Sequence, residues 1–150
     1  MSDEILTYFA STDWNFANGD ETAYPLVAQG VSTAGKSKKI VKYQDLLSGI
    51  EFRIPGYNRG EPFHLGDDNW SYKEQEILGN FLGRLSGESY ARGGFFASAL
   101  AVNARGEPGD GLRKLALQCG ALKANDSNAF LDFWVVEMKK AHAWYSENDW

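Results

Sequence analysis

Apolar residues recur every three or four positions between residues 71 and 86, the spacing of one helix face. The stretch opens on Ser71 and Glu74, which form the S-x-x-E pattern of a capping box. The apolar positions of the face are Ile77, Leu78, Phe81, Leu82 and Leu85. The pattern therefore predicts an amphipathic helix that starts at residue 71 and ends near 86.

Two further helices are predicted in the C-terminal part of the chain. The first covers residues 111–119, with Asp110 as its N-cap and Gly120 as its stop. The second runs from about Ser127 to Glu147. Its core-facing positions are Phe130, Phe133, Trp134, Met138, Ala141 and Trp144.

The N-terminal part gives weaker signals. Residues 4–10 fit either a short strand or a helical turn, and residues 11–22 are polar and rich in turn formers. The stretch from Tyr24 to Ala34 is compatible with a helix, and Gly35 follows it as a natural C-terminal stop.

The middle of the chain predicts a short sheet. Residues 39–43 and 93–103 fit strands, the second of them buried, and residues 43–50 fit a helix. Residues 53–70 hold two prolines and three glycines and form a long loop. The fold class is therefore α/β of the α+β type, one helix-rich domain over residues 1–150 with a short sheet and a long C-terminal helix.

Charge is unevenly distributed along a chain of net charge −5. Residues 1–21 form an acidic N-terminal segment without Lys or Arg, whereas residues 36–42 contain four lysines. Aromatic residues make up 14% of the chain. An acidic, aromatic-rich surface favours a protein partner over a phosphate backbone, unless a local basic patch overrides the global charge.

The sequence indicates a cytoplasmic protein. Its single cysteine, Cys119, excludes an internal disulfide and lies on an apolar helix face, which is typical of an inert thiol. The N-terminus lacks the basic and apolar regions of a signal peptide. No apolar run is long enough to span a membrane, so a membrane role is not expected.

One motif suggests nucleotide chemistry. Residues Gly30 to Ser37 match G-x-x-x-x-G-K-[ST], the pattern of a phosphate-binding P-loop. A true P-loop follows a buried strand and opens a helix, and here a short apolar run behind Pro25 precedes it. We interpret the match as accidental, with a helix stop at Gly35 followed by solvated lysines, and expect no enzyme activity.

No other catalytic or metal-binding set can be assembled. His64 lies near Asp67 and Asp68, but the spacing is not that of known metal ligands. His142 is assigned to a solvated helix face that it shares with Glu137. We therefore expect no catalytic residue, no metal and no cofactor.

Basic residues are the remaining candidates for a binding site. Four lysines are clustered, and two arginines follow with aromatic residues between them, the composition of nucleic-acid surfaces. A solubilising patch is the alternative. The candidate binding residues are Lys36, Lys38, Lys39, Lys42, Arg53, Arg59 and Arg105.

The chain contains the segments "KIVKYQDLL", "ILGNFLGRLSGES" and "FLDFWVVEMKKAHAWY" and a block at residues 90–120, and in these it resembles small bacterial winged-helix-like proteins of unknown function. "KIVKYQDLL" is similar to their "ITYGELA" start, and "ILGNFLGRLSGES" to "LGxxLGxIS". Residues 90–120 resemble the block "GRPLLSALVVNKxTGxPGxGFxxLAxxLG", and "FLDFWVVEMKKAHAWY" resembles the closing "FWxxELxRVxxYW". Phe95 and Phe96 replace smaller aliphatic residues, the aromatic of "PGxGF" is missing, and the loop 53–70 is extra.

The resemblance implies a winged-helix-like fold with a wing-like turn at residues 103–111, and it assigns no catalytic residue. The sequence thus predicts a non-catalytic bacterial interaction protein that binds a protein partner as an inhibitor, immunity or accessory factor. A nucleic-acid-binding winged-helix-like module and a P-loop nucleotide-binding enzyme are the alternatives. The predicted helix 71–86 carries charges that sum to zero, which disfavours it as a reader of a DNA groove.

Overall fold

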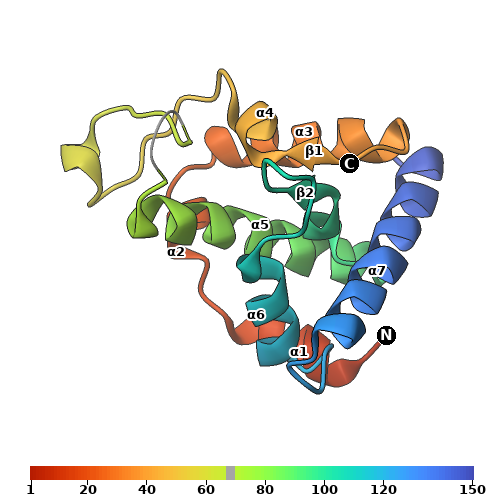
Figure 1. The fold of residues 1–150 in the computed structure, drawn as a ribbon. Coiled ribbons are helices and arrows are strands. Elements are labelled where there is room, and N and C mark those ends of the chain that lie inside the picture. Colours follow the sequence, from red (N-terminus) through yellow and green to blue (C-terminus); the bar gives the residue numbers. More distant parts are fainter. Residues whose placement is uncertain (67–69) are drawn as a thin grey trace.

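The computed structural model describes residues 1–66 and 70–150. Within these residues the chain forms seven α-helices, two 3₁₀ turns and two short strands (Figure 1). In chain order they are α1 (Asp3–Ser11), α2 (Asn15–Asn18), α3 (Ala23–Lys36), β1 (Val41–Lys42), α4 (Tyr43–Leu47), η1 (Asn58–Gly60), α5 (Tyr72–Gly93), η2 (Ala97–Leu100), β2 (Ala101–Val102), α6 (Asp110–Cys119) and α7 (Ser127–Glu147).

Helix α5 crosses the middle of the molecule, and the other elements are arranged around it (Figure 1). On one side lie α3, α4 and the strands; on the other lie α1 and α6. Helix α7 closes one end and contacts both α3 and η2. The predicted helix-rich domain with a short sheet and a long C-terminal helix is therefore confirmed.

The sheet has two parallel strands in the described part of the chain, with Val41 opposite Ala101 and Lys42 opposite Val102. The predicted strand 93–103 is wrong over most of its length, because residues 97–100 form η2. Side chains of α5 and α7 accept hydrogen bonds from the backbone N–H groups at the start of η2. These bonds replace those that a neighbouring strand would make. The donors are the N–H groups of Phe96, Ala97 and Ser98, and the acceptors are Glu137 on α7 and Ser89 and Ser86 on α5.

Helix boundaries follow the predicted caps in most cases. Ser71 and Glu74 form the predicted capping box, and Gly120 ends α6 in the left-handed conformation. Helix α5 continues past the predicted end at 86 and stops at Gly94, whose φ is 73°. Asp110 is not the N-cap of α6: Gly109 occupies that position and Asp110 is the first helical residue.

The N-terminal part is more helical than its polar pattern indicates. Residues 4–10 belong to α1, which Ser2 caps through its Oγ and the N–H of Ile5. The turn-rich stretch 11–22 contains α2. The alternative of a strand at the N-terminus is therefore wrong.

The loop that follows α4 is held in place at both ends. Phe52 and Phe63 pair as an antiparallel bridge and stack their rings. The buried carboxylate of Asp20 accepts hydrogen bonds from the N–H groups of Ala23 and Arg53. Asp67 and Asp68, considered above as neighbours of His64, lie outside the described residues.

The turn expected to form a wing follows β2 directly. Asn103 closes it, because its N–H donates to the carbonyl of Glu107 and its carbonyl accepts from Gly106. Along the described chain the turn leads into α6 rather than into a second strand. The winged-helix likeness therefore stays a prediction.

Candidate functional site

The residues of the P-loop-like motif are helical from Gly30 to Lys36. A Cβ on Gly30 would lie 2.6 Å from Leu46 Cδ1 on α4, and a Cβ on Gly35 would overlap the ring of Tyr145 on α7. Both glycines thus allow another element to approach α3 closely. The predicted helix stop at Gly35 is wrong, because α3 continues through it to Lys36 and packs its glycine face against α7.

Lys36 is engaged by the end of α7. Its Nζ lies 2.9 Å from Asp149 Oδ1, 3.1 Å from the carbonyl of Asn148 and 3.4 Å from that of Tyr145. A cation that bonds the last carbonyls of a helix satisfies acceptors that the helix leaves open and interacts favourably with its dipole. The same contact lowers the pKa of the Asp149 carboxyl below its usual value. Lys36 is therefore a cap of α7.

The chain reverses direction immediately after Lys36. Lys38 has a φ of 54°, in the left-handed region, and the N–H of Lys39 donates to the carbonyl of Ala34. The carbonyl of Lys39 lies 2.9 Å from Nε2 of His142, so this ring nitrogen is the donor. His142 thereby ties the reversal to α7 and is only half exposed, contrary to the solvated face predicted for it.

This reversal and α7 form the two sides of a shallow groove. The groove, which we name the lysine groove, is lined by Lys38, Lys39, Ile40, Met138 and His142 and has a volume of about 460 Å³. Ile40 is 38% exposed, a large value for a bulky apolar residue. The lysine groove thus combines an apolar floor with a cationic rim.

Three lysines of this region have no ion-pair partner within the described residues. In residues 1–66 and 70–150, no carboxylate lies within ion-pair distance of Lys38, Lys39 or Lys42, and all three are exposed. Lys42 follows in β1. Three of the four clustered lysines are therefore available to an external anion, and Lys36 is not.

The three candidate arginines are not part of the lysine groove. The segment that carries Arg53 and Arg59 lies beyond α4, at the end of the molecule opposite α7 (Figure 1). Arg105, in the turn after β2, lies 3.9 Å from Glu107. The basic residues predicted as one surface are therefore spread over separate regions.

Three acids of the N-terminal segment have partners within the chain. Glu21 pairs with Arg84 at 2.7 Å, Glu4 pairs with Lys123 at 3.2 Å, and Asp20 is buried. Arg84 also lies over the ring of Tyr24, 3.7 Å from its centroid. Two of these acids are paired with cations and a third is buried, which leaves less free negative charge than the sequence suggests.

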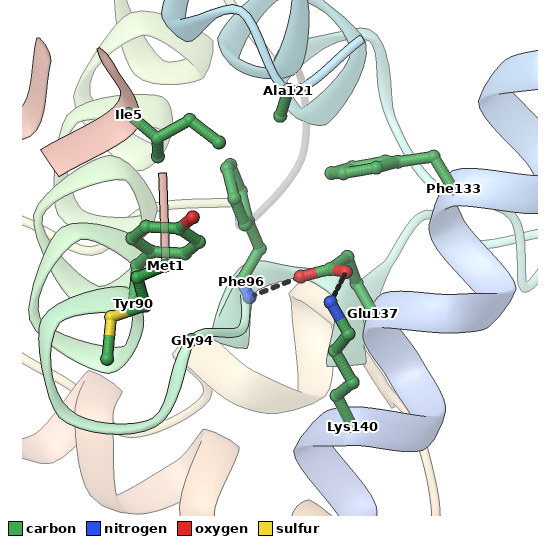
Figure 2. Close-up of a pocket in the computed structure, with 9 residues that line it drawn as sticks. All are labelled: Met1, Ile5, Tyr90, Gly94, Phe96, Ala121, Phe133, Glu137 and Lys140. Atoms are coloured by element: carbon green, nitrogen blue, oxygen red, sulfur yellow. Dashed lines mark hydrogen bonds and ion pairs between the residues drawn. The ribbon is translucent and has the colours of Figure 1, made fainter. Parts of the chain in front are cut away.

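A second cavity lies on another side of α7, where the start of α1 and the end of α5 meet it (Figure 2). Its volume is about 440 Å³. Most of the lining residues are apolar, but polar atoms form a large share of the surface exposed in the cavity, and the lining contains one ion pair, between Glu137 and Lys140. The residues around it are Met1, Ile5, Tyr90, Gly94, Phe96, Ala121, Phe133, Glu137 and Lys140. We name it the Glu137 cavity.

Glu137 is a buried residue that the sequence analysis missed. The charged residues around Glu137 predict a solvated face of the last helix, yet Glu137 is 4% exposed. Phe130, Trp134, Glu137 and Ala141 recur at intervals of four, three and four, so the helical repeat itself places Glu137 on the core side. The apolar pattern was the signal that could have found it.

Burial also shifts the pKa of two further groups. Burial raises the pKa of the Cys119 thiol, as expected for an inert cysteine. Burial and a 2.8 Å hydrogen bond to Glu88 raise the pKa of Tyr24. Within the described part of the chain, His, Cys, Asp and Glu form no group that could hold a metal ion.

None of the described helices has both the length and the apolar character that crossing a bilayer requires. Comparison with models of protein families, with curated proteins and with solved structures finds no match to this chain. The candidate binding sites of the described structure are therefore the lysine groove and the Glu137 cavity.

Proposed function

We propose that this chain is a non-catalytic binding module that takes an acidic segment of a protein partner in the lysine groove. The observation that carries the proposal is the pairing of two apolar side chains, the exposed Ile40 and the half-buried Met138, with the uncompensated cations Lys38 and Lys39. An apolar side chain of the partner would contact the floor, and flanking carboxylates would pair with the rim. Charge complementarity of this kind speeds encounter and selects the partner.

The position of the site differs from the one that the charge distribution first suggested. Net charge favoured an acidic surface as the site that binds a protein partner, but Glu4, Asp20 and Glu21 are engaged within the fold. The uncompensated charge on the lysine groove is positive. We therefore infer an acidic partner segment, consistent with an inhibitor, immunity or accessory role in a bacterial cell.

The test uses peptide display on the intact chain. Selection from a random peptide library is expected to enrich sequences in which Asp or Glu flank a large apolar residue. Synthetic versions should bind less tightly as salt is raised, because the contacts are solvent-exposed charges. Lys38→Glu combined with Lys39→Glu should abolish binding.

Lys114→Glu provides the matched control. Lys114 is exposed on α6, away from the lysine groove, and lies in no ion pair within the described structure. Lys114→Glu changes the net charge of the chain by the same amount as either Lys38→Glu or Lys39→Glu alone. Equal loss of binding in this variant, or enrichment of peptides without acidic residues, would overturn the proposal.

A nucleic-acid-binding role is the second candidate, favoured by the same free lysines and by the resemblance to winged-helix-like proteins. Helix α5 fits this role poorly, since Arg84 is held by Glu21 and Glu88. A mobility-shift assay at low salt separates the two candidates. A shift that the Lys38→Glu, Lys39→Glu variant loses would replace the protein partner by nucleic acid.

We also propose that the chain is not a nucleotide-binding enzyme. The helical conformation of Gly30–Lys36 and the covering of both motif glycines support this, because a P-loop needs its backbone N–H groups open to a phosphate. Calorimetry with ATP and GTP at millimolar concentration tests it. Binding that Lys36→Ala abolishes would show that the motif is functional.

A further inference from the structure

The Glu137 cavity carries an inference independent of the lysine groove. Figure 2 shows the Glu137 carboxylate between the backbone of Phe96 and the side chain of Lys140, below the rings of Phe96 and Phe133. The volume of the Glu137 cavity, about 440 Å³, lies within the range of small-molecule sites. Such sites combine an apolar lining with a few fixed polar groups.

The two oxygens of Glu137 have different partners. Oε1 accepts a hydrogen bond of 3.0 Å from the N–H of Phe96, a backbone group in a fixed position. Oε2 lies 3.0 Å from Nζ of Lys140, three residues further along α7. The Glu137 side chain is 5% exposed and that of Lys140 is 52% exposed. One partner is therefore fixed, and the other is a flexible side chain at the surface.

This difference makes the cation at Oε2 replaceable. A buried carboxylate with one neutral donor would be poorly compensated, so it requires a positive partner. Lys140 can supply that charge only at the cost of restricting its long side chain, which is why half-exposed ion pairs are weak. A ligand cation held by additional apolar contacts can take its place.

The lining favours a cation that carries an apolar group. The rings of Tyr90 and Phe133 both contact Phe96 edge-on, with centroids at 5.6 and 5.3 Å. Aromatic faces attract ammonium groups and also offer apolar area. Ile5 and Ala121 complete an aliphatic wall. A simple inorganic cation would leave this apolar surface unused.

We propose that the Glu137 cavity binds a small aryl- or alkylamine, whose ammonium displaces Lys140 from Oε2 and whose apolar group lies against Phe133, Ile5 and Ala121. The bond from the Phe96 N–H to Oε1 is retained in the bound state. Lys140 acts as an internal competitor that keeps the carboxylate paired when no ligand is bound.

The test is a titration with phenethylamine, followed by NMR through the backbone amides of Gly94 and Phe96. Saturable shifts of these amides are expected with the amine, and none with 3-phenylpropionate, which has an acid in place of the amine. Lys140→Ala should tighten amine binding roughly two- to fivefold, because the competing ion pair is removed. Glu137→Gln should weaken it about tenfold or more, while an amide oxygen still accepts from Phe96.

Lys139→Ala is the matched control, since it removes the same charge from the neighbouring exposed position of α7. Its amine affinity should equal that of the unmodified chain. The proposal is wrong if no titration shifts these amides at millimolar ligand, if the acid binds as well as the amine, or if Lys140→Ala weakens amine binding. If Glu137→Gln does not fold, Lys140→Ala still tests the proposal, because it leaves the Glu137 bond to Phe96 in place.

Discussion

Residues 30–36 and residues 38–42 are adjacent in one stretch of sequence, yet they have opposite environments. In the first segment Gly30 and Gly35 are covered by Leu46 and Tyr145, and Lys36 is bonded to the end of α7. In the second segment the lysines are exposed and lack a carboxylate partner in the described structure. The first segment is part of the core, and the second is a candidate binding surface.

The difference shows why a motif needs its structural context. A glycine in a P-loop leaves backbone N–H groups open to phosphate, whereas a glycine on a helix face lets another helix approach. Glycines in these two roles can produce the same sequence motif. The neighbouring elements decide between them, and here α7 lies directly on the motif.

The largest effect is expected from Gly35→Ala. The added Cβ would overlap the Tyr145 ring, so α3 and α7 would have to separate. Overpacking of this kind costs about 1–3 kcal/mol and outweighs the gain in helix propensity, up to about 1 kcal/mol. Urea denaturation should show a lower midpoint for the variant.

Gly79→Ala is the control for this prediction. Gly79 lies within α5, and a Cβ there would meet nothing within 4 Å. The substitution should therefore raise the free energy of unfolding, by up to about 1 kcal/mol. If Gly35→Ala is also stabilising, the close packing of α3 on α7 is wrong.

A smaller effect on stability is expected from removing the hydroxyls of two buried tyrosines, Tyr24 on α3 and Tyr145 on α7. Tyr24 donates to Glu88 at 2.8 Å, so Tyr24→Phe should cost about 1 kcal/mol. The hydroxyl of Tyr145 has no hydrogen-bond partner in the part of the chain that the structure describes. Tyr145→Phe should be neutral or slightly stabilising. Thermal unfolding of both variants checks the order, and a larger loss in Tyr145→Phe would contradict it.

Lys36 and Lys38 should separate stability from binding. Lys36→Ala removes the contacts to Asp149 and to the last carbonyls of α7, so a small decrease in Tm is expected. Lys38→Ala removes no ion pair of the described chain and should leave Tm unchanged, while weakening binding of acidic peptides. Calorimetry and peptide titration on the two variants measure both properties. Equal behaviour of the two lysines would remove the contrast between the segments.

The smallest expected effect is a pH dependence of the Lys36 contribution. The hydrogen bond from Lys36 lowers the pKa of Asp149, so the carboxylate stabilises the fold above its unfolded pKa and loses this effect as pH falls through the folded value. The Tm difference between the unmodified chain and Lys36→Ala should therefore shrink below about pH 4. When Asp149→Asn is present in both chains, position 149 has no carboxylate to protonate. The Tm difference caused by Lys36→Ala should then show no such change with pH. A difference that grows with acid would have the wrong sign.

Local signals were sufficient for the long helices. Ser71 with Glu74 marked the start of α5, Gly120 marked the end of α6, and the apolar repeat gave the bounds of α7. These features depend on residues a few positions apart. Sequence periodicity and capping therefore predicted them correctly.

The failures depend on contacts between distant residues. Residues 97–100 have the composition of a buried strand, but hydroxyls of α5 and the Glu137 carboxylate take the backbone donors at their start. Gly35 has the composition of a helix stop, but Tyr145 packs on it and the helix continues. The basic residues at 38 and 39 were predicted as a site, whereas Met138 and His142 could not be linked to them without the fold.

The contact between α3 and α7 has a kinetic consequence for the lysine groove. Lys36 and Tyr145 are 109 positions apart, and contacts of such separation require a long loop to close during folding. One side of the groove belongs to the segment after α3 and the other to α7. The groove is therefore complete only when this closure has occurred. A partner that binds there would recognise the fully folded chain and would not bind intermediates in which α7 is still detached.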